Sequence, residues 1–188
     1  YLSKHIADCV AAARYIHEII PCGGMLLDVG SGAGFPSLPI AVMLPDISVT
    51  ALDSTAKKTA YIERAASFVG CTNVSTLTGR AEELVYGRRE TFDVVTARAV
   101  ARLNVLLELC APFVAVGGYF VAMKGAAAQE EADEAANAAK QLGLAPAEII
   151  PYSLPGIDDS RAFVSYRKLS PSPDRYPRQD SVIAKKPL

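Results

Sequence analysis

The residues of this sequence best suited to chemistry lie in the segment 28–36, which reads DVGSGAGFP. Its alternating glycines would let the backbone approach a ligand closely. A dinucleotide site would have the spacing G-x-G-x-x-G, yet Phe35 stands at the position of the last glycine, and no Gly-Lys-Ser/Thr follows to make a P-loop. Asp28, two residues before the first glycine, disfavours a phosphate and favours a cation. S-adenosylmethionine carries an ammonium and a sulfonium and no phosphate, so the segment indicates this cofactor.

A second acidic residue, Asp53, indicates a nucleoside. It follows the predicted strand 47–52 and lies 23 residues after Gly30. A carboxylate at this point can bind both hydroxyls of a ribose, although NAD would use the same acid. Asp53 could instead be a helix N-cap or a turn residue, but Ser54 and Thr55 are better caps. We therefore expect Asp53 to bind the ribose of an adenosine cofactor.

Three later positions would reach the same edge of the sheet. The loop 79–83 follows the third predicted strand and could contact the adenine, or it could begin a helix with acidic residues in its first turn. Arg98 follows the fourth strand, where a substrate would meet the methyl group. It could hold a phosphate or a guanine edge, or form a surface ion pair. Lys124 ends the fifth strand and is a second candidate contact for an anion or a base.

The segments that must position these residues alternate between strand and helix patterns. This alternation predicts an α/β protein with a mostly parallel sheet of about seven strands and helices on both faces. Pro155 and Gly156 lie in the short link between the last two strands, so that pair should be antiparallel. Gly117 and Gly118 are expected to form a turn. The expected strands are 25–29, 47–52, 74–78, 92–96, 119–123, 147–152 and 161–167, and the expected helices are 2–20, 36–44, 55–69, 101–110 and 126–142.

Length and composition indicate one main domain. The 188 residues are 51% hydrophobic and 21% charged, which suits a globular chain with a substantial core. We expect an N-terminal helix at 1–20, a main domain at 21–169 and a basic tail at 170–188. The sequence contains no window of about 18 uncharged apolar residues, so we do not expect a membrane span. The four cysteines show no paired spacing, which indicates buried thiols in a reducing compartment rather than disulfides. We also expect the protein to be cytoplasmic, to be a monomer and to have no metal site.

Charge is distributed unevenly along the chain. Residues 161–188 contain seven Lys/Arg and two Asp, a net charge of +5, whereas the whole chain has a net charge of −1. A basic tail on an acidic body indicates contact with a polyanion. A solvated terminus without a partner is the alternative.

Several motifs together resemble one known family, the bacterial small-subunit (16S) ribosomal RNA guanine-N7 methyltransferases, also called glucose-inhibited division protein B. The matching segments are LLDVGSGAGFPSLPIAVMLP, LDSTAKKTAYIE, GRAEEL, FDVVTARAVARLNVLLELC and the ending RYPRQDSVIAKKPL. The resemblance covers essentially the whole chain. It implies a class I, Rossmann-like methyltransferase fold that uses S-adenosylmethionine on a guanine of 16S ribosomal RNA or of the small subunit. The cofactor residues that it implies are Gly30, Phe35, Asp53, Ser54, Thr55, Ala81, Glu82 and Arg98.

The sequence departs from this family in two places. The family usually has a helical segment before the position of Tyr1, so the helix at 1–20 is interpreted as the remnant of that segment. The family also often has Pro-Gly-x-Pro-Asn after Tyr-Pro-Arg, where this chain has QDSVIA at 179–184.

The expected chemistry needs few catalytic groups. N7 of guanine has a lone pair and no proton, so it can attack the methyl group without a general base, and catalysis would depend on positioning and desolvation. Arg98 is the predicted catalytic residue, and His5 and His17 are interpreted as structural or surface residues. Thr96-Ala97-Arg98-Ala99 is unlike the Asn/Asp-Pro-Pro-Tyr loop of amino-group methylation. Cys110 is predicted to lie in the core, which disfavours a nucleophilic cysteine for pyrimidine C5 methylation.

Binding of RNA is predicted from cationic and aromatic residues near the substrate edge and in the tail. A methyltransferase for another RNA, a protein or a small molecule, a nicotinamide-dependent oxidoreductase and a non-catalytic binding module are the alternative functions. The predicted RNA contacts are Arg102, Lys124, Arg175, Tyr176 as a stacking platform, Arg178, Lys185 and Lys186.

Overall fold

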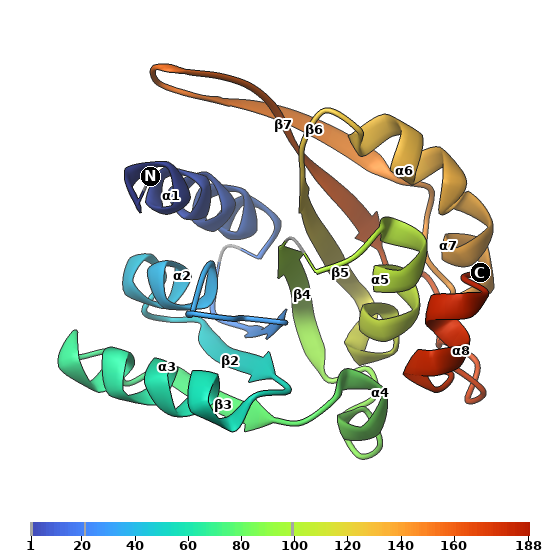
Figure 1. The fold of residues 1–188 in the computed structure, drawn as a ribbon, viewed down its shortest axis with the longest axis horizontal. Helices are drawn as coiled ribbons and strands as arrows, with labels where there is room; N and C mark the ends of the chain where they lie inside the picture. Colours follow the sequence, from blue (N-terminus) through green and yellow to red (C-terminus); the bar gives the residue numbers. More distant parts are fainter. Residues whose placement is uncertain (1, 21, 99) are drawn as a thin grey trace.

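A computed structural model describes residues 2–20, 22–98 and 100–188 (Figure 1). Within this part of the chain, one sheet of seven strands has the order β3-β2-β1-β4-β5-β7-β6. Strands β1 to β5 pair in parallel, whereas β7 is antiparallel to both β5 and β6. The predicted fold class and the antiparallel last pair are therefore confirmed. The strands are β1 (Met25–Val29), β2 (Ser48–Asp53), β3 (Val74–Thr78), β4 (Phe92–Arg98), β5 (Val114–Lys124), β6 (Glu148–Leu154) and β7 (Ile157–Arg167).

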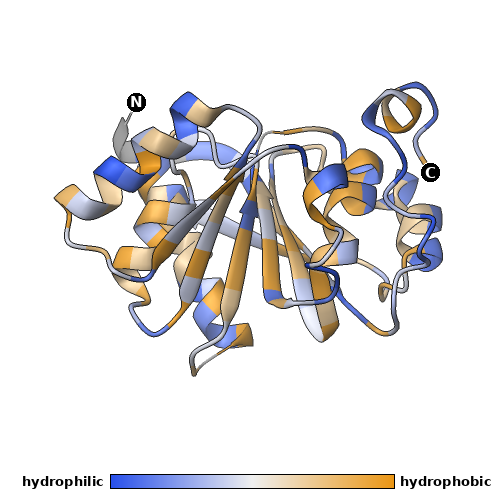
Figure 2. Cartoon of the chain, turned by 90° about the horizontal axis from the view of Figure 1, so that it is seen from below, coloured by the Kyte–Doolittle hydropathy of each residue, from blue (hydrophilic) through white to orange (hydrophobic). Residues whose placement is uncertain are grey.

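Helices cover both faces of the sheet, as Figure 1 shows. Alternate strand residues supply the two cores because successive side chains of a strand point to opposite faces. Leu26 and Val94 pack with the helices α1 and α2, whereas Leu27 and Val95 pack with residues of the helices from α4 onward. Figure 2 shows hydrophobic residues along the central strands and on the helix faces over them. The helices are α1 (Leu2–Ile19), α2 (Ser37–Met43), α3 (Ala56–Phe68), α4 (Ala81–Leu84), α5 (Leu103–Cys110), α6 (Ala128–Glu134), α7 (Ala136–Gln141) and α8 (Asp180–Lys185).

The strand order places a ligand-binding crevice at the end of β1. The chain moves from β1 outward to β2 and β3, and then returns to the other side of β1 for β4 and β5. In open α/β sheets, ligands bind outside the carboxyl ends of the strands where the order reverses in this way. The glycine-rich turn after β1 lies at this reversal point.

Strand β5 and the helical segment after it differ from the expectation. Gly117 and Gly118 are not a turn but part of β5, which begins at Val114. A Cβ on Gly118 would lie 2.5 Å from the carbonyl oxygen of Asp93, so a glycine is needed where the pairing with β4 shifts register. The single helix expected at 126–142 is divided into α6 and α7 at Ala135.

The segment 170–188, expected as a separate basic tail, packs against the domain. The side chains of Tyr176 and Ile183 belong to the larger hydrophobic core. Arg178 forms an ion pair with Glu108 of α5, with Nη2 and Oε2 2.6 Å apart, and its backbone N–H also donates to that carboxylate. Lys168, which is buried, donates to the carbonyl oxygen of Ala111 and to a serine hydroxyl of this segment. These contacts make the C-terminal segment part of the fold.

Across residues 2–20, 22–98 and 100–188, no helix is both long and apolar enough to cross a bilayer.

Candidate active site at the carboxyl ends of the strands

The turn between β1 and α2 is fixed to the end of β2 by its backbone. The N–H groups of Gly30 and Ser31 both donate to the carbonyl oxygen of Leu52, over 2.8 and 3.0 Å. Gly30 has a φ of 75°, and a Cβ there would lie 2.6 Å from Cγ2 of Val100. Gly32 has a φ of 58°, and a Cβ there would meet only a carbonyl oxygen at 3.9 Å. The turn is therefore crowded at its base and open at its tip, which leaves room for a ligand beside bare backbone.

Asp53 links this turn to the start of α3. Its Oδ2 accepts hydrogen bonds from the backbone N–H of Gly32 (3.0 Å) and from Nζ of Lys58 (3.3 Å), and its Oδ1 accepts from the N–H of Thr55 (2.9 Å). Burial alone would raise the pKa of Asp53, but these three bonds outweigh burial and lower it. The carboxylate is therefore ionised and fixed in place. It also acts as the turn residue that was the alternative interpretation, because it accepts the Thr55 amide.

Asp28 lies deeper than the sequence suggested. It is 1% exposed, and among the described residues neither of its carboxylate oxygens has a well-formed hydrogen-bond partner. Burial raises the pKa of Asp28 to about 6, and the nearby hydroxyl groups of Ser31 and Ser37 only partly oppose that rise. A buried carboxylate without partners is costly unless a cation compensates it. Asp28 thus fits a cationic group bound over the glycine turn.

Six of the eight cofactor residues expected from the sequence line one cavity of about 360 Å³. It is bounded by the glycine turn, the ends of β2 and β4, and the loop before α4. Two predicted residues do not line it: the ring of Phe35 packs 5.9 Å from the guanidinium carbon of Arg98, and Thr55 contacts Asp53 through its amide. The predicted residues that line the cavity are Gly30, Asp53, Ser54, Ala81, Glu82 and Arg98.

The C-terminal segment supplies a wall of this cavity that the sequence did not reveal. Asp180 lines the cavity, and its Oδ2 lies 2.9 Å from Nη1 of Arg80, another lining residue. The Arg178–Glu108 pair anchors the chain two residues before Asp180. The sequence contains no signal for this contact, because Arg80 and Asp180 are 100 positions apart.

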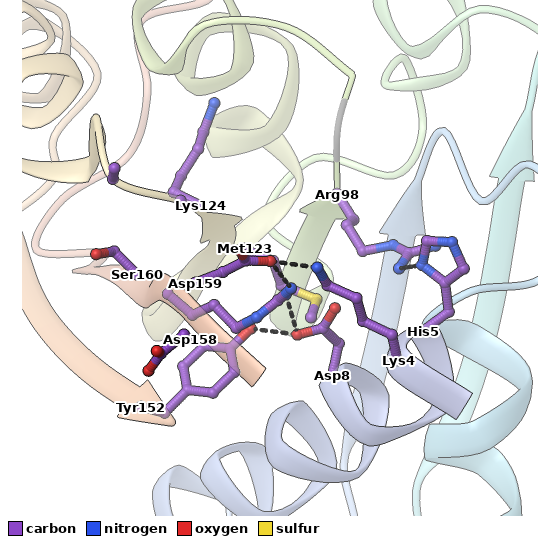
Figure 3. A pocket seen from close by; sticks show the side chains of 13 residues that line it. Lys4, His5, Asp8, Arg98, Met123, Lys124, Tyr152, Asp158, Asp159 and Ser160 are labelled. Atoms are coloured by element: carbon purple, nitrogen blue, oxygen red, sulfur yellow. Dashed lines mark hydrogen bonds and ion pairs between the residues drawn. The ribbon is translucent and has the colours of Figure 1, made fainter. Parts of the chain in front are cut away.

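A larger cavity, of about 650 Å³, adjoins the first at Arg98, which lines both (Figure 3). Nη1 of Arg98 donates to Nδ1 of His5 over 3.0 Å. His5, interpreted from the sequence as structural or surface, thus lies in the cavity and holds the predicted catalytic arginine. The walls come from α1, the end of β5 and the β6–β7 hairpin, through Lys4, His5, Asp8, Met123, Lys124, Tyr152, Asp158, Asp159, Ser160 and Arg161.

Three of the predicted RNA contacts are engaged inside the protein. Tyr176 is 4% exposed, and its hydroxyl donates to Gln141, so its ring is not available for stacking on a base. Arg178 is used by Glu108. Lys124 has only 11% of its side chain exposed, and its Nζ lies 2.7 Å from Glu131. These contacts argue against the predicted roles of the three residues in binding RNA.

The other four predicted RNA contacts are accessible. Arg102 forms an exposed ion pair with Glu134. The guanidinium of Arg175 lies over the ring of Tyr176, 5.0 Å from the ring centroid. Lys185 and Lys186 are exposed at the end of α8. Cys110 is fully buried, and burial raises the pKa of its thiol, so the prediction that it lies in the core is confirmed.

Solved structures share this architecture. An rRNA methylase from Streptococcus thermophilus superposes with a TM-score of 0.61 at 18% identity, over 85% of this chain and 95% of that one. TYW2 from M. jannaschii, in complex with AdoMet, superposes with a TM-score of 0.64 at 12% identity, over 86% of this chain and 77% of that one. The fold is therefore that of the class I S-adenosylmethionine-dependent methyltransferases.

Sequence comparisons are more specific than these superpositions. The family model for rRNA small subunit methyltransferase G (GidB) matches residues 1–153. Ribosomal RNA small subunit methyltransferase G of Lactobacillus acidophilus is 39% identical over 187 residues, which are 98% of this chain and 78% of the relative. The protein of the same name from Clostridium beijerinckii is 39% identical over 189 residues, which cover 100% of this chain and 78% of the relative. The chain therefore belongs to the rRNA small subunit methyltransferase G family.

Proposed function

We propose that this protein transfers a methyl group from S-adenosylmethionine to N7 of a guanine in 16S ribosomal RNA. The observation that carries the proposal is the meeting of two cavities at Arg98 in a chain of this family. The smaller cavity has the features of an adenosine site, and the larger one has room for a nucleotide. Their shared wall is where a methyl group would pass from one to the other.

The residues of the smaller cavity fit the cofactor. Asp53, ionised and fixed by three hydrogen bonds, would accept the ribose hydroxyls. Ala81 and Glu82, with the Arg80–Asp180 pair beside them, would enclose the adenine. The buried carboxylate of Asp28 would offset the positive charge of the methionine part, since no cationic side chain in the described part of the protein lies within hydrogen-bond distance of it.

The protein contributes position and exclusion of water. S-adenosylmethionine supplies a methyl group that is already activated by its sulfonium, so no side chain needs to remove a proton from guanine N7. Arg98 is held by His5 on one side and by the ring of Phe35 on another, which fixes a cation at the boundary between the cavities. A cation there would repel the sulfonium, so Arg98 should act on the acceptor, through the guanine O6 or a phosphate.

Binding of the RNA itself would use the accessible cations. Arg102, Arg175, Lys185 and Lys186 are the predicted contacts that remain exposed, and contacts of this kind with phosphates make binding salt-dependent. The larger cavity, here called the acceptor cavity, would then receive one base flipped out of the RNA structure.

The test uses the purified protein with small subunits from a bacterial strain that lacks this activity. We expect transfer of a tritiated methyl group to 16S RNA, at a guanine that becomes sensitive to borohydride and aniline cleavage, the chemical signature of N7 methylation. Asp53→Ala should greatly reduce transfer, and Asp174→Ala should not, because Asp174 is fully exposed in the C-terminal segment. Label in free nucleosides, in protein or in another RNA would contradict the proposal.

A further inference from the structure

The acceptor cavity contains a buried carboxylate with only one oxygen that accepts hydrogen bonds from the described residues. Asp8, on α1, is 5% exposed and lines the cavity. Its Oδ1 accepts hydrogen bonds from the hydroxyl of Tyr152 on β6, over 3.0 Å, and from Nη1 of Arg161 on β7. Its Oδ2 has no hydrogen-bond partner among the residues that the structure describes. Figure 3 shows this second oxygen turned away from Tyr152.

The surroundings hold the carboxylate of Asp8 in place. Arg161 is a permanent cation, and only 14% of its side chain is exposed, so the pair is largely removed from water. The ring of Tyr152 stacks on Phe163, with centroids 4.3 Å apart, and Phe163 stacks in turn on Tyr15. A fixed anionic oxygen that faces a cavity is a preorganised acceptor for an N–H group of a ligand.

Guanine has the donors that such an oxygen would select. Its N1–H and its 2-amino group form one edge of the base, whereas adenine has an acceptor at N1 and no amino group at C2. O6 and N7 lie on the other side of guanine. A base that presents N7 to the cofactor cavity would therefore place O6 near Arg98 and turn its N1–H and amino edge toward the opposite part of the cavity.

We propose that Asp8, held by Tyr152 and Arg161, accepts hydrogen bonds from the N1–H and 2-amino edge of the target guanine and selects guanine over adenine. This inference rests on the proposed function. Methylation at N7 gives the purine a positive charge, so the same carboxylate would stabilise the base more strongly as the methyl group is transferred. Asp8 would thus contribute to specificity and to rate.

The other carboxylates of the cavity are less suited to this role. Asp159 is exposed and already paired with Lys4 and Arg161. Asp158 is exposed in the hairpin, where water competes for its oxygens, so its interactions should be weak. Asp174 provides the control, because it is an exposed carboxylate that does not line this cavity.

The first experiment compares Asp8→Asn with Asp174→Asn. The asparagine oxygen should stay with Tyr152 and Arg161, which turns its NH2 group to the cavity, so a donor would face the donors of guanine. We expect kcat/KM for the RNA to fall roughly 10- to 100-fold in Asp8→Asn, as for loss of a charged hydrogen bond. It should stay within about twofold in Asp174→Asn, where only an exposed carboxylate outside the cavity is lost. The Kd of S-adenosylhomocysteine, measured by calorimetry, should be unchanged in both, which shows that the fold and cofactor cavity are intact.

The second experiment leaves the wild-type protein unaltered and changes the RNA. Once the methylated guanine has been mapped, inosine at that position removes only the 2-amino group and keeps N7. We expect kcat/KM to fall roughly tenfold with wild-type protein when inosine replaces guanosine. In Asp8→Asn the same replacement should change kcat/KM little, since that variant already lacks the contact with the 2-amino group. Wild-type protein that methylates inosine as efficiently as guanosine would overturn the proposal even where Asp8→Asn does not fold.

The outcomes separate this inference from the function it rests on. Formation of N7-methylguanine by the wild type, with Asp8→Asn active within threefold and inosine accepted as well as guanosine, would overturn the role of Asp8 and leave the proposed function standing. Failure of the wild type to form N7-methylguanine in any RNA would overturn both.

Discussion

Replacement of Asp28 by asparagine should stabilise the ligand-free protein and weaken its binding of the cofactor. Burial raises the pKa of Asp28 from 3.8 to about 6, which corresponds to a cost of about 3 kcal/mol for the ionised form in the folded state. The folded protein therefore binds this proton more tightly than the unfolded chain does. The free energy of unfolding should fall as pH rises from about 4 to 6, and the loss should be complete above about pH 7.

The variant does not carry this pH-dependent cost, because asparagine does not ionise. At pH 8 we expect Asp28→Asn to be more stable than the wild type by up to about 3 kcal/mol. The difference should shrink by about 1.4 kcal/mol at pH 5, where the folded wild type is already mostly protonated. The hydroxyl of Ser37, which lies close to this carboxylate, can accept from the new amide, so the substitution need not leave a buried donor unpaired.

Urea unfolding at the two pH values measures the stability, and calorimetry with S-adenosylhomocysteine measures the binding. The affinity of the wild type should decrease below about pH 6 as Asp28 takes up its proton, while Asp28→Asn should bind roughly 10- to 100-fold more weakly at pH 8. Asp46→Asn, which changes an exposed carboxylate, is the matched control. A stability difference that is equal at pH 5 and pH 8, or an unchanged affinity, would refute the assignment of Asp28 as the buried counter-charge of the cofactor.

Three further predictions concern the other parts of the site. Gly30→Ala should reduce binding of S-adenosylhomocysteine by more than tenfold in calorimetry, because the added Cβ has no room and the φ of 75° strains an L residue; normal affinity would mean that the turn can shift. Arg178→Ala should lower the free energy of unfolding by about 3 kcal/mol, because the fully buried Glu108 loses its cation; urea unfolding tests this, and a stability equal to that of the wild type would show that the C-terminal segment is not docked in solution. Lys185→Ala combined with Lys186→Ala should weaken RNA binding and reduce the slope of log K against log salt by about 1.8, with cofactor affinity unchanged; an unaltered slope in filter binding would remove both lysines from the RNA contact.

The docked C-terminal segment changes the interpretation of the charge pattern. The sequence places an excess of cations in residues 161–188, but Arg161, Lys168 and Arg178 are used inside the protein, by Asp8, by a backbone carbonyl and by Glu108. The cations that remain for a polyanion are therefore fewer than the net charge implies. A count of charges along a segment does not distinguish an ion pair within the fold from a free side chain.

Local patterns were sufficient for the architecture and for the core of the cofactor site. Apolar runs and helical periodicity predicted the alternating elements, because a strand buried on both faces and an amphipathic helix each need a repeating side-chain pattern. The turn at Gly30 and Gly32 and the acid at Asp53 were also predictable, since each follows a strand directly in the chain. Parallel strands bring their carboxyl ends to one edge, so these short-range features meet without any knowledge of the tertiary packing.

Other features depended on contacts between distant parts of the chain. Asp8 meets Arg161 across 153 positions, and Asp180 meets Arg80 across 100. The burial of Asp28 and of Tyr176 likewise follows from what packs over them. The type of a side chain determines which partners it can bind, but only the packing of the helices on the sheet determines which partner is within reach and whether water still competes for it.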